Sequence, residues 1–445
     1  MTDSIAGLPF WDVTFDAEGD PDTRTTDALL AETGNLTDLY VFTHGWNNER
    51  RTARRLYDAF FELLARQLAA DPRGTAGFAG VYWPSQQWSD DPIPDFTAAT
   101  AGGGGVAAFA PADRETFVAD PALDDRTLAD LLDTFPDAKA PLEQMAALLR
   151  EEQPTQHTLD DFFAALKDFS AQAAAGEDDG EGASGRPRML EDNANDVFGR
   201  YADALVDSGA QIPGGDGTAG IGDRLRRLRN GAKEALRGAT YWEMKGRAGV
   251  VGRKGLGPLL GRLAAARPGL RIHLIGHSFG ARLVSYALDG LPAGASPVKS
   301  VTLLQGAFSH FAFCRPLPFD AGRNGALATR EQRVDGPLTV CFSSHDGAVG
   351  RFYPLASLAA RDDIAGVRDL LYRWGGMGAD GAQNADAVLD GIQPAGPGAV
   401  YRFAKNRILN VDCSEIVRNG GSPSGAHSDI VHPEVTWIVL AASRT

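Results

Sequence analysis

The sequence predicts an α/β fold with a mostly parallel central sheet, and two stretches of the chain support this prediction. In the first, the apolar residues Ile272, Leu274 and Ile275 indicate a buried strand, and a helix follows after the turn Gly276–Gly280. In the second, a strand, a helix and another strand succeed one another between residues 39 and 83. Strands that alternate with helices are typical of parallel sheets covered by helices.

The N-terminal strand–helix–strand unit begins with the apolar run Leu39–Thr43, which predicts a buried strand. That strand ends at the sequence His-Gly-Trp-Asn-Asn of residues 44–48. A helix with one apolar face follows, marked by Tyr57, Phe60, Phe61, Leu64 and Leu68. Gly77–Trp83 then predicts a second strand, which Pro84 and Ser85 close. We therefore assign residues 1–85 to the first part of the α/β core.

Residues 86–222 depart from this pattern and predict a helical insertion. Three segments have apolar residues at helical spacing, and the strongest is marked by Leu159, Phe162, Phe163, Leu166 and Phe169. The glycine-rich runs 101–105, 174–185 and 209–217 are expected to be flexible or disordered. The apolar faces must pack on something, so we expect either a lid over the sheet or a structural helical layer.

Residues 223–445 predict the second part of the α/β core. Leu283, Val284, Ala287 and Leu288 continue the helix after the glycine turn. The later apolar runs predict strands over Val298–Leu304, Leu338–Phe342, Val400–Phe403 and Ile408–Cys413. A last helix is expected over Pro433–Ala442, because proline is tolerated in the first turn of a helix.

Composition narrows the classes of function and compartment. The 445-residue chain has a formal net charge of −15, which argues against a nucleic-acid-binding protein. No apolar stretch approaches the roughly 18 residues of a membrane span, so no transmembrane helix is expected. No signal peptide is visible, and the three cysteines (Cys314, Cys341 and Cys413) are far apart, which suits a reducing compartment. We therefore expect a cytoplasmic protein.

The segment 224–271 is rich in arginine and lysine, although the chain as a whole is acidic. We expect its arginines and lysines on a solvated helix face, balanced by acidic neighbours. Peripheral contact with anionic lipid, or contact with nucleic acid, is the alternative that this segment leaves open.

The turn Gly276–Gly280 has the form Gly-x-Ser-x-Gly, which between a strand and a helix presents its serine as a nucleophile. The two glycines have no Cβ, so the strand and the helix can approach closely there. A serine hydroxyl needs a base, and the base needs an orienting acid. Asp346 directly follows a predicted strand, and His427 precedes the last helix. Ser278, Asp346 and His427 are therefore the predicted catalytic residues.

Other residues compete for these roles. Asp412 follows a late strand and is the alternative acid, while Asp380, Asp386 and Asp390 lie in a glycine-rich segment and are weaker. His432 adjoins Pro433 and fits better as a residue of the helix start, and Asp429 is expected to cap that helix. His345 adjoins the proposed acid and would require an unusual chain order. His44 is expected to shape its loop, because a triad needs only one base.

With these motifs in place, the chain resembles the α/β-hydrolases, and within them a group of bacterial enzymes that pair His-Gly-Trp/Tyr-Asn with Trp-Pro-Ser. The matching segments here are residues 44–47 and 83–85. The resemblance covers about 36–90 and 240–442, whereas the insertion is unmatched. It implies an oxyanion hole formed by the backbone N–H groups of Trp46 and Phe279.

These observations favour a serine hydrolase that cleaves carboxylic esters of small molecules or lipids through an acyl-enzyme on Ser278. An amidase, a peptidase or an acyltransferase would use the same triad, and a non-catalytic binding protein could use the same scaffold. No cofactor is implied: no cysteine or histidine cluster has metal-site spacing, and no phosphate-binding loop is present beyond the serine turn.

Overall fold

One nine-stranded sheet organises the chain in the computed structural model, which describes residues 3–85, 88, 120–173, 188–207, 211, 220–349, 375–396, 398–420 and 424–445. The strand order is β1-β2-β4-β3-β5-β6-β7-β9-β8. Only β1 runs antiparallel to its neighbour, so the predicted mostly parallel α/β sheet is confirmed. The strands are Asp3–Ile5, Leu8–Thr14, Asp38–Thr43, Ala76–Tyr82, Arg271–His277, Val298–Leu304, Leu338–Phe342, Gln393–Pro394 and Ile408–Asp412, as β1 to β9.

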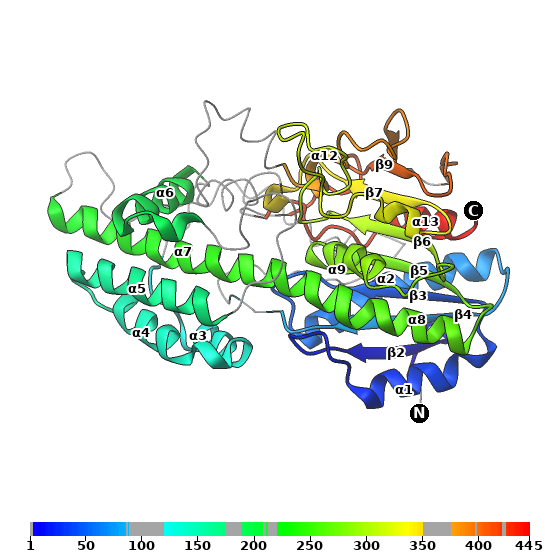
Figure 1. Ribbon diagram of the computed structural model, residues 1–445, viewed down its shortest axis with the longest axis horizontal. Coiled ribbons are helices and arrows are strands. Elements are labelled where there is room, and N and C mark those ends of the chain that lie inside the picture. The colour runs from blue at the N-terminus through cyan, green and yellow to red at the C-terminus, as the bar shows by residue number, and fades with distance from the viewer. Residues whose placement is uncertain are drawn as a thin grey trace, which may run out of the picture.

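Helices cover both faces of the sheet (Figure 1). Side chains alternate along a strand, so Tyr40 and Phe42 of β3 face one layer while Leu39 and Val41 face the other. On the Tyr40 side pack α2 (Arg50–Ala70) and α13 (Pro433–Ser443). On the other side pack α1 (Thr23–Glu32), α8 (Gly257–Ala266) and α9 (Phe279–Asp289). The core therefore consists of two apolar layers, one on each face.

One predicted strand is wrong. Residues 400–404 form no strand, although Val400–Phe403 has the apolar pattern of one. Instead, Tyr401 is buried in the layer that contains α13, and Phe403 packs on the same layer. The edge strand is the short β8, which pairs with β9. Tyr401 and Phe403 thus pack in this apolar layer without a strand ladder, and Val400 is exposed.

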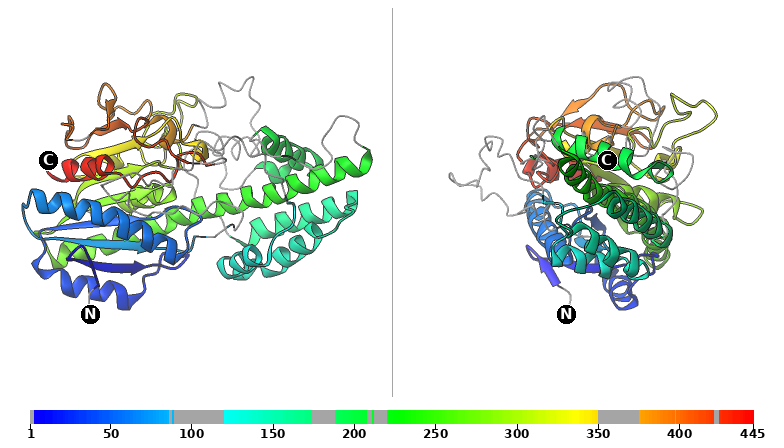
Figure 2. Two further views of the ribbon diagram at one scale, coloured as in Figure 1. Left: turned by 180° about the vertical axis from the view of Figure 1, so that it is seen from behind. Right: turned by 90° about the vertical axis from the view of Figure 1, so that its left-hand side faces the viewer.

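The insertion helices form one bundle with a long helix, α7 (Ile221–Val250). They are α3 (Asp125–Thr134), α4 (Lys139–Leu149), α5 (Gln156–Gln172) and α6 (Ala194–Asp207). A π-helical turn, Val251–Leu256, joins α7 to α8. We refer to α3–α6 and the first part of α7, up to residue 239, as the helical arm. Figures 1 and 2 show that it extends away from the sheet.

The direction of α7 places the arm relative to the sheet. The ring of Tyr241 contacts the ring of Phe279 at the start of α9, and a Cβ on Gly252 would lie 2.2 Å from the carbonyl of Leu283 further along α9. The two helices therefore run in the same direction, side by side. From Tyr241 back to Ile221 the helix continues for roughly 30 Å at its usual rise. The arm thus projects beyond the carboxyl edge of the parallel strands.

The apolar faces of the insertion are buried within the arm. Phe162, Phe163, Leu166 and Phe169 are all buried, and both Phe162 and Phe163 pack edge-on against the ring of Phe198 of α6. These side chains therefore pack against other arm helices and not against the sheet. That the insertion moves as a lid stays a prediction, and the runs 101–105 and 174–185, with most of 209–217, lie outside the described residues.

The basic segment is less solvated than the sequence predicts. Lys233 and Lys245 of α7 are both buried. The Nζ of Lys233 donates to the carbonyl of Asp120 at 2.9 Å, and the Nζ of Lys245 lies 4.6 Å from the ring centre of Trp242. The prediction of a solvated face is wrong for these two residues, because α7 is covered along much of its length. No helix within the described ranges has the length and apolar character to cross a membrane.

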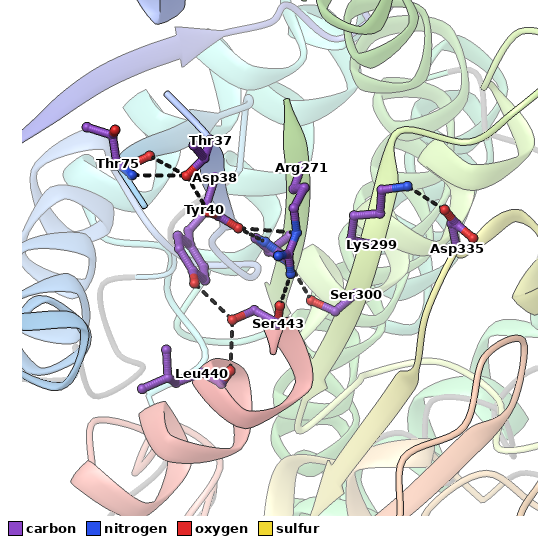
Figure 3. Close-up of polar contacts among 11 residues, drawn as sticks. Thr37, Asp38, Tyr40, Thr75, Arg271, Lys299, Ser300, Asp335, Leu440 and Ser443 are labelled. Atoms are coloured by element: carbon purple, nitrogen blue, oxygen red, sulfur yellow. Dashed lines mark hydrogen bonds and ion pairs between the residues drawn. The ribbon is translucent and has the colours of Figure 1, made fainter. Parts of the chain in front are cut away.

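A hydrogen-bonded cluster occupies the amino edge of the sheet (Figure 3). The imidazole of His273 on β5 bonds Asp38 through Nε2 and Ser300 through Nδ1, both at 2.9 Å. The ring of Tyr40 stacks on His273, and its hydroxyl lies 2.9 Å from the hydroxyl of Ser443. We call these five residues the amino-edge network. It fastens the end of α13 to the first residues of the parallel strands.

Candidate active site

Ser278 lies on a strained turn between β5 and α9. Its φ of 58° and ψ of −122° are rare for a residue with a side chain. A Cβ on Gly276 would lie 2.4 Å from the carbonyl oxygen of Gly280, and a Cβ on Gly280 would lie 2.1 Å from that of Thr43. Neither position tolerates a side chain, so the two glycines permit the close approach that the turn needs.

The loop 44–48 meets Ser278 and is held by the Trp-Pro-Ser motif. A Cβ on Gly45 would lie 2.5 Å from the Cβ of Ser278, so the loop and the turn touch. The hydroxyl of Ser85 donates to the carbonyl of Gly45 at 3.2 Å, and Nε1 of Trp83 donates to the carbonyl of His44 at 3.1 Å. The two motifs are distant in sequence but form a single structural unit beside the serine.

His44 supports this loop from within. The residue is 1% exposed, its ring stacks on Trp83 at 5.6 Å, and its Nδ1 donates to the carbonyl of Gly45 at 2.9 Å. Burial lowers the pKa of His44 to about 4, so the imidazole is neutral at pH 7. A buried neutral ring bonded to its own loop fits the expected shaping role.

Asp346 and His427 are brought together from two different loops. The loops pair at an isolated bridge between Asp346 and Gly425, and the N–H of Ala426 donates to the carbonyl of His345 at 2.9 Å. Nδ1 of His427 lies 2.8 Å from Oδ2 of Asp346, whose carboxyl group is fully buried. A carboxylate partner places the proton on Nδ1, which leaves the lone pair of Nε2 available to act as a base.

His277 connects this pair to the serine turn. It precedes Ser278, and its Nε2 donates to the carbonyl of His427 at 2.8 Å. Burial, and then the proximity of His427, lower the pKa of His277 to about 3, so it is a neutral donor. No hydrogen bond joins Ser278 to His427 among the described residues, and such catalytic bonds often form only when substrate is bound. No pattern in the sequence points to this role of His277.

The competing acids are engaged elsewhere. Asp412 accepts from the N–H of Ser414 at 2.9 Å and from its hydroxyl at 2.5 Å. Asp380 bonds Nδ1 of His310 at 2.8 Å, a pairing that the sequence did not predict. Neither carboxylate contacts His427, so the geometry favours Asp346 as its partner.

Around the last helix one expectation is confirmed and one is wrong. His432 is the residue at the N-cap of α13, as expected from its position before proline. Asp429 does not cap that helix: its Oδ1 bonds Nε2 of His432 at 2.8 Å, and its Oδ2 accepts from the N–H groups of Arg418 and Asn419. His345, the remaining alternative base, has an exposed side chain.

The two predicted oxyanion-hole residues flank Ser278. Phe279 follows it at the start of α9, where helical N–H groups have no partner within the helix. The ring of Trp46 lies 6.2 Å from the ring of Phe279. Tyr241 of α7, which belongs to no recognisable motif, contacts both rings. The only sequence signal for it was a pair of adjacent aromatic residues in an arginine-rich helix.

Within the described residues, no group of three or more His, Cys, Asp or Glu side chains is arranged to hold a metal ion. Comparison with known proteins adds no assignment: no protein-family model, curated protein or solved structure matches the chain.

Proposed function

We propose that this protein is a serine hydrolase of the α/β-hydrolase type that cleaves carboxylic esters. Ser278 is the nucleophile, His427 the base and Asp346 the residue that orients the base. The observation that carries the proposal is the hydrogen bond between His427 and the buried carboxyl group of Asp346, in loops fastened to the serine turn by His277. The serine follows β5, the acid follows β7 and the histidine follows β9, which is the chain order of this fold.

The chemistry follows from the roles of these groups. As Oγ of Ser278 attacks the ester carbonyl, Nε2 of His427 accepts its proton, and the same proton then passes to the departing alcohol. Water attacks the acyl-enzyme by the same route and releases the acid. The N–H groups of Trp46 and Phe279 stabilise the oxyanion of each tetrahedral intermediate, and the loss of one such donor typically costs about 3 kcal/mol of barrier.

The proposal is tested by turnover of p-nitrophenyl esters of graded acyl length, with the matching anilides measured beside them. We expect ester hydrolysis by the wild-type protein and none above background for Ser278→Ala. Ser344→Ala is the matched control, because this exposed serine lies two residues from Asp346 and has no proposed role. Retention of more than a few per cent of wild-type kcat by folded Ser278→Ala would contradict the assignment. Turnover of anilides in preference to esters would move the activity to the amidase class.

A further inference from the structure

The helix α7 is tied to the loop 44–48 by a hydrogen-bonded bridge through Trp88. Nε1 of Trp88 donates to the hydroxyl of Thr240 at 3.2 Å, and both side chains are fully buried. The backbone of Trp88 also bonds the side chain of Asn47 twice: its N–H donates to Oδ1, and its carbonyl accepts from Nδ2 at 3.5 Å. A continuous path of hydrogen bonds thus runs from α7 to the residue after Trp46.

The next residue of α7 makes a second contact with the same loop. The ring of Tyr241 lies 5.7 Å from that of Trp46, edge-on, and 4.9 Å from that of Phe279. Together with the contact between Trp46 and Phe279, the three rings are in mutual contact. The tyrosine therefore packs against both residues that we propose as oxyanion donors.

The loop needs such support because its backbone is unusual. Asn47 has a φ of 61°, in the left-handed region, which is uncommon for residues with side chains although asparagine enters it more often than most. Such backbone conformations persist where several surrounding contacts hold them in place. The two bonds to Trp88 supply part of this constraint, and Trp88 in turn depends on Thr240 of α7.

We infer that α7 positions the oxyanion loop, residues 44–48, with Thr240 and Tyr241 as positioning residues, so that the helical arm is joined to the site through α7. The inference rests on the proposed function, because the loop matters for rate only if Trp46 donates to an oxyanion. Displacement of the loop would reduce stabilisation of the transition state more than binding of the substrate. The reason is that the carbonyl oxygen of the bound substrate carries less negative charge than the oxyanion and depends less on the two N–H donors.

The first arm of the experiment measures turnover in three threonine variants. Thr240→Val keeps the shape but removes the acceptor of Trp88, whereas Thr240→Ser keeps the hydroxyl. Thr436→Val is the matched control, because Thr436 is also a buried helical threonine whose hydroxyl donates to a backbone carbonyl, but on α13. For Thr240→Val we expect kcat to fall about ten- to a hundredfold with KM little changed. The Ki of a trifluoromethyl ketone, which mimics the tetrahedral intermediate, should rise by the same factor. Thr240→Ser and Thr436→Val should stay near wild type.

The second arm requires no turnover. Amide hydrogen exchange of the peptide over residues 44–48 should accelerate in Thr240→Val and in Tyr241→Ala, while Tyr241→Phe and Thr436→Val leave it unchanged. Unchanged exchange in both folded test variants, or equal acceleration in the control, overturns the inference. Loss of kcat without a rise in the ketone Ki also overturns it. If the wild-type protein hydrolyses no ester but the exchange responds as expected, the proposed function fails while the positioning of the loop by α7 stands.

Discussion

Each edge of the sheet pairs a histidine with an aspartate and has a serine in the same region of the fold, but the surroundings differ. At the amino edge, both ring nitrogens of His273 are occupied, by Ser300 and by Asp38. At the carboxyl edge, His427 bonds Asp346 through Nδ1, and its Nε2 has no hydrogen-bond partner among the described residues. The side chain of His273 is 0% exposed and that of His427 is 12% exposed.

The difference arises from where the residues lie on the strands. His273 is inside β5 and is in register with Tyr40 of β3 and Ser300 of β6, so neighbouring strands enclose it. Asp346 and His427 lie in loops beyond the strands, where the carboxyl group of Asp346 is buried and the side chain of His427 is partly exposed. Residue types and distances are therefore insufficient to identify a catalytic triad. The Nε2 of His427, unbonded within the described residues, the partial exposure of this side chain and its position at the carboxyl edge are the features that distinguish the proposed site from the amino-edge network.

The largest expected effect comes from replacing the two histidines. His427→Ala should lower kcat for an activated ester by roughly a millionfold with a small change in stability, because it removes the base. His273→Ala should instead be destabilising, by about 2–5 kcal/mol, because it leaves a cavity and removes a buried hydrogen-bond partner of Asp38 and Ser300. Parallel measurement of kcat and urea unfolding checks both. A comparable loss of kcat in folded His273→Ala would show that the amino-edge histidine also takes part in turnover, which contradicts the proposed difference between the two edges.

Replacing the two aspartates should distinguish the two edges in the same way, with smaller losses of kcat and of unfolding free energy. We expect Asp346→Asn to lower kcat roughly ten-thousandfold, since the amide no longer orients the base. Asp38→Asn should leave kcat unchanged and cost about 1.5–3 kcal/mol of unfolding free energy, because its hydrogen bonds lose their charge. Asp412→Asn is the control variant for the acid. An inactive Asp412→Asn beside an active Asp346→Asn would transfer the role to Asp412.

The buried histidines at both edges make stability depend on pH. Burial lowers the pKa of His44 to about 4 and that of His277 to about 3, and it also lowers the pKa of His273. Below the unfolded pKa of about 6.5, the unfolded chain binds protons that the folded protein does not, so stability falls as the pH falls. Each such histidine contributes a slope of about 1.4 kcal/mol per pH unit between that value and its folded pKa.

Urea unfolding at several values between pH 7.5 and pH 5 measures this slope. The variant His277→Gln removes one titrating group, so its slope should be shallower than that of the wild type by about 1.4 kcal/mol per pH unit. An equal slope in the variant would show that His277 does not resist protonation in the folded state.

The smallest effect is expected at Ser300. Ser300→Ala should cost about 1 kcal/mol of unfolding free energy through its lost hydrogen bond to His273, without any change in kcat. Thermal unfolding with an ester assay provides the measurement. A large loss of activity in this variant would indicate that the amino-edge serine takes part in turnover.

Local sequence patterns predicted the strands and the serine turn because their causes are local. The apolar run of β3 and the glycines at 276 and 280 act within a few residues of where they stand. The pattern at 400–403 failed because Tyr401 and Phe403 pack in the apolar layer that contains α13 without strand pairing, and no local feature records that packing. The partnership of His273 with Asp38 depends on strand register across 235 positions of sequence, which a linear pattern does not contain. Tyr241 was missed for the same reason: its role depends on where α7 crosses the loop 44–48.

Locating the reactive serine tests the proposed triad most directly. Wild-type protein is treated with a fluorophosphonate, digested and mapped by mass spectrometry, with His427→Ala and Ser278→Ala treated in parallel. We expect modification of Ser278 alone in the wild type, with greatly slowed labelling of His427→Ala and none of Ser278→Ala. Modification of another serine, or no modification of folded wild-type protein, would contradict the proposed triad.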